Sequence, residues 1–443
     1  MARLNIAMLS AQEQTQEEST PIEAQSELDV VGQQVEDSIA QATEIQFQIE
    51  QTQEAVQETE EVVQQVEEER QVLEQAQAQG GAEQAAMESL QRAMKRFEKR
   101  TGVPSAISSM GMESFGSKTT RAQATKIAME GAKEYIKKLI KILTEAMVSM
   151  WKKVKGFLVK ITEGAGKLLD RAKKVKEAVL GAKGETAPAD AKVTEESVLA
   201  FAQVGGKAVE GDKFVTEFLK LTDEKGAAAK EVMKPFDDVD GNDFATKLIE
   251  YANKEDKKGE IVQLAISFSG PQGGKKEDGV VGYESDQQWL GNYKKDMAYY
   301  FAKDATYEQV AANQQKLSGG GLVVVNSDKK PESVKPLTVE QAIAISDRVI
   351  EIMETMKTPD KRVIEFEDAI EKVVTKSKEL EKADDADVKQ IQTATGIIRS
   401  KYNSAIAAIV SFRAYIAKLS KAALDYAVAS IRAATGKTQT AQA

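Results

Sequence analysis

The 443-residue chain contains no cysteine and no histidine. Without cysteine there can be no disulfide framework, thiolate nucleophile or sulfur-ligated metal site. Without histidine the chain lacks the commonest general base and metal ligand, which rules out a Ser-His-Asp triad and a histidine-ligated zinc site. Carboxylate chemistry stays open, but no convincing pair of carboxylates stands out. We therefore expect a protein that is not an enzyme and that has no cofactor and no metal.

Long apolar runs are also missing. No stretch reaches the ~18 to 20 apolar residues of a membrane-spanning helix. Residues 1–9 carry one arginine and a weak apolar patch, which is too short for a secretory signal. We expect a soluble chain that is made in a cytoplasm.

Charge divides the sequence sharply. Residues 1–113, which we call the head, hold 22 acidic and 7 basic side chains, a net charge of −15. Residues 114–443, which we call the body, carry a net charge of +5, within a total of −10. Most of the positive charge lies in residues 114–183, with 17 basic and 6 acidic side chains. Removing the head would therefore change the net charge of the protein from negative to positive.

The head is expected to be partly disordered and partly helical. Residues 1 to about 28 have little to bury and favour disorder. Between Gly32 and Gly80 there is neither glycine nor proline, which predicts one long helix, and a short basic helix is expected at 91–100. A heptad seam fits the long helix, although about a third of it is polar. This favours either a coiled coil that needs partners, including self-association, or a solvated single helix. The seam positions are Val35, Ser38, Ala42, Ile45, Ile49, Thr52, Val56, Thr59, Val63, Val66, Arg70 and Leu73.

Residues 114–183 predict a long amphipathic helix. Its apolar residues recur at steps of three and four and form one stripe. These residues are Ile136, Leu139, Leu143, Met147, Met150, Val154, Phe157 and Ile161. Lysines occupy the other faces. The candidates for contact with DNA phosphates or with a protein partner are Lys133, Lys137, Lys138, Lys141, Lys152, Lys153, Lys155 and Lys160.

Three interpretations of this helix remain open. It can be a core helix with solvated lysines, a helix that neutralises DNA phosphates without reading bases, or a cationic helix on a membrane surface. The third interpretation uses residues 135–161, with Trp151 and Phe157 on the apolar face. The first two are compatible, because a helix can bury one face and present the other to DNA. A packed helix cannot place its apolar face on lipid.

A short motif recurs near the charge reversal: a small residue, any residue, then glutamate. It occurs at residues 86–88, at 128–130, and at Gly111, Met112 and Glu113, followed by Ser114. The segment 111–130, GMESFGSKTTRAQATKIAME, leads into the tryptophan- and lysine-rich helix. This arrangement resembles the internal head proteins of giant phiKZ-type tailed bacteriophages, whose prohead protease cleaves after such tripeptides.

The resemblance implies a virion structural protein of the capsid interior, made in the host cytoplasm. The acidic head would be a propeptide that directs the chain into the prohead core and is cut off after Glu113. The body would stay with the packaged DNA or be ejected with it. The implied partners are the prohead protease, other capsid or core proteins, and DNA bound non-specifically. A membrane-active protein kept latent by its acidic segment is the alternative, and an ejected protein that acts on the host is a third interpretation.

The rest of the body is expected to have two parts after a linker at 184–191. Residues 192–330 predict a small α+β domain, with strands at 261–269, 279–284 and 322–326 and helices at 195–203, 212–224, 243–254 and 286–303. The last of these helices would have Trp289, Tyr293, Met297 and Tyr300 on one face, and a further helix is expected after a capping box of Thr306 and Gln309. Residues 331–443 predict an antiparallel helical bundle. Its first helix is expected to start at a capping box of Thr338 and Gln341 and to end near 357, and the next two lie at 360–382 and 388–434. The basic helix can complete this bundle. The fold class is therefore mainly α, with a small α+β insert.

Two motifs in the insert are rejected as sites. Residues 269–276 are glycine- and lysine-rich, but they lack the first glycine and the closing hydroxyl residue of a phosphate loop. Residues 237–243 are acidic, but a calcium-loop alignment places Phe236 and Lys247 at ligand positions. We expect a turn and an acidic loop at these places.

Overall fold

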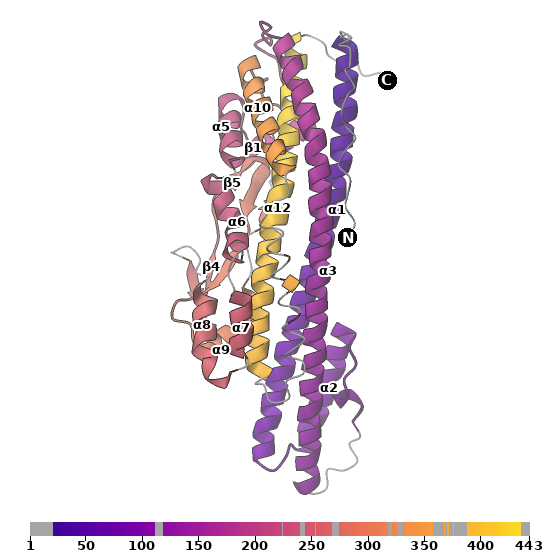
Figure 1. Cartoon of the computed structure of the whole chain (residues 1–443), viewed down its shortest axis with the longest axis vertical. Coiled ribbons are helices and arrows are strands. Elements are labelled where there is room, and N and C mark those ends of the chain that lie inside the picture. Colours follow the sequence, from indigo (N-terminus) through magenta and orange to yellow (C-terminus); the bar gives the residue numbers. More distant parts are fainter. Residues whose placement is uncertain are drawn as a thin grey trace, which may run out of the picture.

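Long helices aligned along one axis make up most of the molecule (Figure 1). The structure is a computed structural model that describes residues 21–110, 118–223, 225–239, 244–252, 254–267, 274–317, 321–325, 331–357, 367, 370–371, 375 and 388–435. The principal helices are α1 (Pro21–Ala78), α3 (Lys118–Gly181), α10 (Val339–Met356) and α12 (Val388–Thr435). The mainly α fold class is confirmed.

These four helices pack as one bundle, in which α1 runs antiparallel to α3 and to α12. Helix α1 runs opposite to α3, because the Lys167 ammonium group donates to Ser38 Oγ at 2.9 Å near the start of α1, whereas Lys153 donates to Thr52 Oγ1 at 2.8 Å further along. The order of these contacts along the two helices is reversed. The basic helix α3 packs with the C-terminal helices, as predicted, and the head adds a further helix, α1, to the same bundle.

Helices α10 and α12 complete the bundle. Lys176 of α3 pairs with Asp347 of α10 at 2.7 Å. Helix α12 runs opposite to α1, because Arg399 lies beside Glu60 at 2.6 Å and Lys421 lies 3.7 Å from Glu36. Helix α3 is thus in contact with α1, α10 and α12 (Figure 1).

The predicted apolar stripe of α3 is the centre of the core. Its eight side chains, from Ile136 to Ile161, are each at most 2% exposed. The first half of the stripe packs in a hydrophobic cluster with α1, α2 (Gln84–Thr101) and η1 (Ile107–Ser109). The second half packs in a larger cluster with α1, α12 and the insert. Head and body therefore share both hydrophobic cores.

The predicted seam of α1 faces this core, and none of its twelve positions is exposed. The coiled-coil interpretation holds, and the partners of the seam are helices of the same chain. The helix begins at Pro21, inside the segment expected to be disordered, because proline suits the first helical position. It ends before Gly80 and Gly81, whose φ values of +98° and +105° make the turn. A Cβ on Gly81 would meet the backbone of Ala122 and Arg121 at 2.5 Å, so this close approach requires glycine.

The insert between α3 and α10 is a small α+β region that covers α12 on one side (Figure 1). Its helices are α4 (Glu196–Phe201), α5 (Gly211–Leu221), α6 (Ala227–Val239), α7 (Phe244–Ala252), η2 (Glu255–Lys257), α8 (Lys258–Ser267), η3 (Leu290–Asn292), α9 (Tyr307–Asn313) and η4 (Gln314–Lys316). Its strands are β1 (Gln203–Val204), β2 (Lys207–Ala208), β3 (Lys275–Glu277), β4 (Val280–Tyr283), β5 (Gln288–Trp289), β6 (Tyr293–Lys295), β7 (Ala298–Phe301) and β8 (Leu322–Val324). All paired strands are antiparallel, in the orders β1-β2, β3-β4-β7 and β5-β6-β8.

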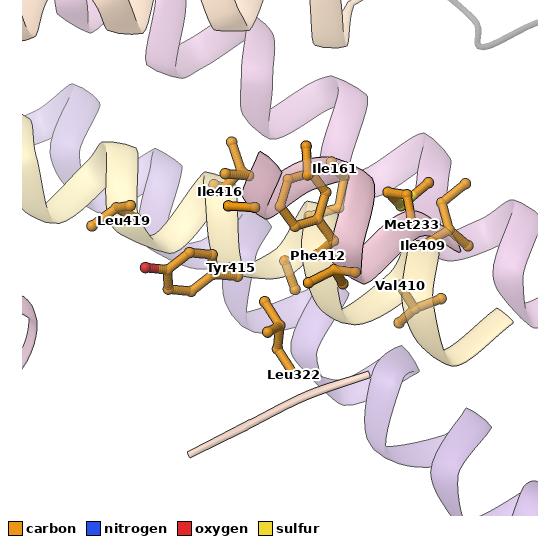
Figure 2. Close-up of a cluster of buried hydrophobic side chains, with 14 of the residues drawn as sticks. Ile161, Met233, Leu322, Ile409, Val410, Phe412, Tyr415, Ile416 and Leu419 are labelled. Atoms are coloured by element: carbon orange, nitrogen blue, oxygen red, sulfur yellow. The ribbon is translucent and has the colours of Figure 1, made fainter. Parts of the chain in front are cut away.

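Side chains of α12 hold the insert to the bundle. Figure 2 shows Phe412 and Ile409 of α12 close to Ile161 of α3 and Met233 of α6, with Leu322 of β8 below the helix. This cluster is apolar and buried, so burial of hydrophobic surface fixes the insert on the bundle.

Two predicted elements of the insert are wrong. Residues 261–267 form the end of helix α8 instead of a strand, because Ile261, Val262 and Ala265 share one buried helical face. Residues 286–303 form strands instead of a helix. Gly291 and Asn292 have positive φ, which ends any helix there and turns the chain.

The C-terminal predictions agree with the structure where it describes the chain. Thr338 and Gln341 form the capping box at the start of α10, and Thr306 and Gln309 form the one at α9. Helix α12 matches the predicted helix at 388–434. The helix expected at 360–382 lies almost wholly outside the described residues, as do most of the residues expected to form the turn at 269–276 and the acidic loop at 237–243.

Truncating the stripe should destabilise the fold. We expect Phe157→Ala to lower the free energy of unfolding by about 3 to 5 kcal/mol, because Phe157 is fully buried and a cavity would remain. Val159, two residues later on the same helix, is 56% exposed, so Val159→Ala should change stability by less than about 0.5 kcal/mol. Urea unfolding followed by circular dichroism measures both variants, and equal losses would contradict the proposed packing.

Candidate functional site

The candidate site is the polar surface of α3, which we call the lysine surface and define by its eight lysines: Lys133, Lys137, Lys138, Lys141, Lys152, Lys153, Lys155 and Lys160. None of the eight is buried. Lys138, Lys141, Lys152 and Lys155 are exposed, and the other four are half-buried. A helix that buries one stripe must direct its remaining positions outwards, so the fold itself presents these lysines.

The eight lysines differ in their contacts. Lys155 pairs with Glu367 at 2.5 Å, and Lys160 pairs with Glu163 at 2.9 Å on the same helix. Lys137 lies 3.6 Å from Glu134. These exposed pairs are weak and are screened by salt, so they leave most of the positive potential available.

Lys138, Lys141 and Lys152 form no ion pair within the part of the chain that the structure describes. They lie within about 60° of one another around α3, given ~100° per residue. Three unpaired ammonium groups on one helical face are suited to phosphate contacts along a nucleic-acid backbone. They are the strongest candidates among the eight.

Lys153 has a different role. Its ammonium group donates to the Gln48 carbonyl at 3.3 Å and to Thr52 Oγ1 at 2.8 Å, both on α1. Lys167, which was not among the predicted contacts, holds α1 in the same way through Gln34 O and Ser38 Oγ. These two lysines therefore join head and body.

The apolar stripe that a membrane-surface role would need is covered. Trp151 is 3% exposed and Phe157 is fully buried, in contact with α1, α12 and the insert. The folded chain therefore does not offer this face to lipid. Within the described residues, no helix combines the length and the apolar character of a membrane span.

The three small-x-Glu motifs lie in different settings. Residues 86–88 are in α2, where Met87 is fully buried, and residues 128–130 are in α3, where Ala128 is fully buried. The predicted cleavage residues Gly111, Met112, Glu113 and Ser114 lie outside the described residues, in the connection between η1 and α3.

A buried ion pair joins α1 to α12. Arg399 Nε lies 2.6 Å from Glu60 Oε1, and the two side chains are 5% and 6% exposed. Burial raises the pKa of the Glu60 carboxyl above its ordinary value of 4.5, against the lowering effect of the Arg399 guanidinium. Neither residue was among the predicted site residues. A charged residue next to an apolar seam is a weak signal, and the partner lies 339 positions away.

A second polar cluster joins α1, α3 and α12 near the start of α1. Arg171 Nη2 lies 2.7 Å from Asp425, which also pairs with Lys421 at 3.0 Å. Lys421 in turn lies 3.7 Å from Glu36 of α1. Gly32 allows α1 to approach Arg171 closely, because a Cβ at this position would lie 3.3 Å from the Arg171 guanidinium. Together with Glu60 and Arg399, this cluster gives the head polar anchors at two levels.

The described residues contain no group of three or more acidic side chains placed to hold a metal ion. A cavity of about 230 Å³ lies between α1, β8 and α12 and is lined by Glu60, Asn403 and Ser411 among others.

The comparison with known families covers both head and body. A family described as phiKZ-like phage internal head proteins matches residues 23–429. The chain belongs to this family. A search of curated proteins found no match, and neither did a search of solved structures.

The match gives this internal head protein a structural role inside the phage capsid. It begins near the start of α1 and ends near the end of α12, so it spans the whole bundle. The resemblance predicted from residues 111–130 and the helix that follows them is confirmed over most of the chain.

Removing Arg399 should make stability depend more strongly on pH. Because the folded state raises the pKa of Glu60, protonation of this carboxyl favours folding, and its contribution falls as the pH rises through that raised value. Arg399→Met removes the charge that opposes this rise, so it should cost about 3 kcal/mol at about pH 7.5 and less at about pH 5, because protonation of Glu60 at lower pH removes the unpaired buried charge.

Urea unfolding at both pH values measures this difference. Arg100→Met is the matched control, because Arg100 pairs with Glu58 and Glu61 at the surface and should cost about 1 kcal/mol or less. A loss for Arg399→Met that is equal at the two pH values would contradict the assignment.

Proposed function

We propose that this internal head protein is a structural component that enters the prohead core through its acidic head. A prohead protease then cuts it after Glu113, and the body stays with the packaged DNA or is ejected with it. The observation that carries the proposal is the arrangement of side chains on α3: its apolar stripe is buried, whereas its lysines face solvent. Synthesis in the host cytoplasm belongs to the same proposal.

The lysine surface supports non-specific contact with DNA. Lysines neutralise phosphates as point charges and release counterions, without reading bases. Lys138, Lys141 and Lys152 are exposed while the head is in place, so phosphate contact needs no unfolding of α3. The net charge of the head, −15, opposes DNA at long range, and its loss would leave a body of +5.

The exposed face of α1 supports recruitment into the core. Away from its buried seam, α1 presents the exposed carboxylates of Asp37, Glu44, Glu50, Glu54, Glu68 and Glu74. An acidic ridge of this kind steers the chain towards basic protein partners and away from DNA. Core proteins with basic surfaces are the partners that fit it.

The position of the motifs supports a cut at Glu113. A protease reads an extended, accessible segment, and the motifs at 86–88 and 128–130 are in helices with buried residues. Cutting at either would require local unfolding of a shared core. The motif at 111–113 lies between two described elements and interrupts neither of them.

The first test of this proposal measures DNA binding. The triple variant Lys138→Gln, Lys141→Gln, Lys152→Gln should weaken binding of the full chain to duplex DNA and lower the slope of log affinity against log salt by about 2 to 3. Lys213, Lys230 and Lys303 are exposed lysines of the insert, and changing these three to glutamine alters the net charge equally. Fluorescence anisotropy at about 50 to 200 mM salt compares the two triples. Equal effects would show that only net charge matters.

The second test concerns processing. Mass spectrometry of the protein from purified particles should find an N-terminus at Ser114. The variant Glu113→Gln should retain the uncut chain, because the glutamate side chain defines the motif. A chain from particles that still begins at Met1 or Ala2 would contradict the cleavage step.

A further inference from the structure

We propose that the head stays docked on the body as a separate chain after the cut, so that its departure is a second step distinct from proteolysis. This inference rests on the cleavage proposed above. It concerns α1 and α2 of the head and the surface of α3 and α12 that they cover. The occupant of that surface is residues 21–101 of the same chain.

The apolar contacts of the head do not depend on the connection that is cut. Helix α1 places Val35, Ile39 and Ile49 in the core shared with α12, and Val63 and Val66 in the core shared with α2. Hydrolysis of one peptide bond between η1 and α3 removes none of this buried surface. The hydrophobic free energy that holds the head therefore remains after the cut.

Departure of the head would expose a large apolar surface. Ile136, Leu139 and Leu143 of α3 are at most 1% exposed and pack in the cluster formed with α1 and α2. Met87 and Leu90 of α2 would lose the same cover. Soluble proteins rarely expose contiguous apolar patches of this kind, so separation is unfavourable unless another surface covers the stripe.

Polar contacts fix the docked position. The Glu60–Arg399 pair is buried between α1 and α12, and it can form only when the two helices are in one register. Lys153 and Lys167 of α3 donate to carbonyl and hydroxyl oxygens of α1 at two further levels, both N-terminal to Glu60. A shifted head would leave Arg399 buried without a partner, so the head either docks in this register or leaves entirely.

The cut itself changes only the effective concentration of the head at its docking surface on the body. Before hydrolysis, residues 111–117 tether the head to the body and hold it at an effective concentration on the millimolar scale. After hydrolysis the same interface must hold without a tether. An interface of two shared cores resembles an obligate one, which stays assembled when the covalent link is lost.

The experiment replaces residues 111–117 by the recognition segment of a specific protease. After complete cleavage, gel filtration and native mass spectrometry should show one species that contains both fragments in equal amounts, like the uncut control. Separation of the fragments in native buffer would overturn the inference. It would not touch the proposed cleavage, which the N-terminus of the particle protein tests independently.

A variant tests the role of the buried Glu60–Arg399 pair in holding the head. In the cut protein, Arg399→Met leaves Glu60 buried without its partner, so it should speed dissociation of the head roughly tenfold or more at about pH 7.5. The increase should be smaller at about pH 5, because protonation of Glu60 removes the unpaired charge. Arg100→Met, which breaks surface pairs between α1 and α2, should leave the rate within about threefold. Equal rates for the two variants would contradict the role of the buried pair.

A second route covers the case in which the engineered chain does not fold. Residues 1–110 and 118–443 are produced together as two separate chains. They should co-purify one to one through a tag on the shorter chain. Failure to co-purify, with the body alone folded, would overturn the inference.

Discussion

Burial of the apolar stripe on α3 is the interaction on which the rest of the structure depends. The stripe runs from Ile136 to Ile161, and no single neighbouring helix covers it. Helices α1 and α2 cover its first half, and α1, α12 and the insert cover its second half. Each large side chain buried there contributes roughly 1.5 to 3 kcal/mol. The long helices of the chain therefore align with this stripe, although they are far apart in sequence.

The same burial decides where charge appears. Because the apolar face of α3 is packed in the core, its lysines face solvent. In the same way, α1 packs through its apolar seam, so most of its carboxylates face solvent. An acidic and a basic surface thus coexist on one folded molecule. Two of the charges that lie between α1 and α12 are buried as a pair, Glu60 and Arg399. Such a pair sets the register between α1 and α12 more than it adds stability.

Local patterns predicted the helices well and the insert poorly. Thr338 and Gln341 form the expected capping box, because such boxes depend only on neighbouring residues. The spacing of Trp289 and Tyr293 was interpreted as one helical face, yet these residues are partners across a tight turn between β5 and β6. A separation of four residues fits both arrangements, and only the positive φ at Gly291 distinguishes them. The Glu60–Arg399 pair had no local signal that could reveal it.

The sequence by itself determined the family resemblance, the mainly helical fold class, the buried stripe and the lysines opposite to it. These follow from helical periodicity and charge, which are properties of short segments. Only the tertiary structure decided that the acidic head is a packed part of the bundle, with its seam on α3 and Glu60 against Arg399. The reason is physical: an apolar seam requires burial but does not specify its partner, and that choice depends on how all the long helices pack together.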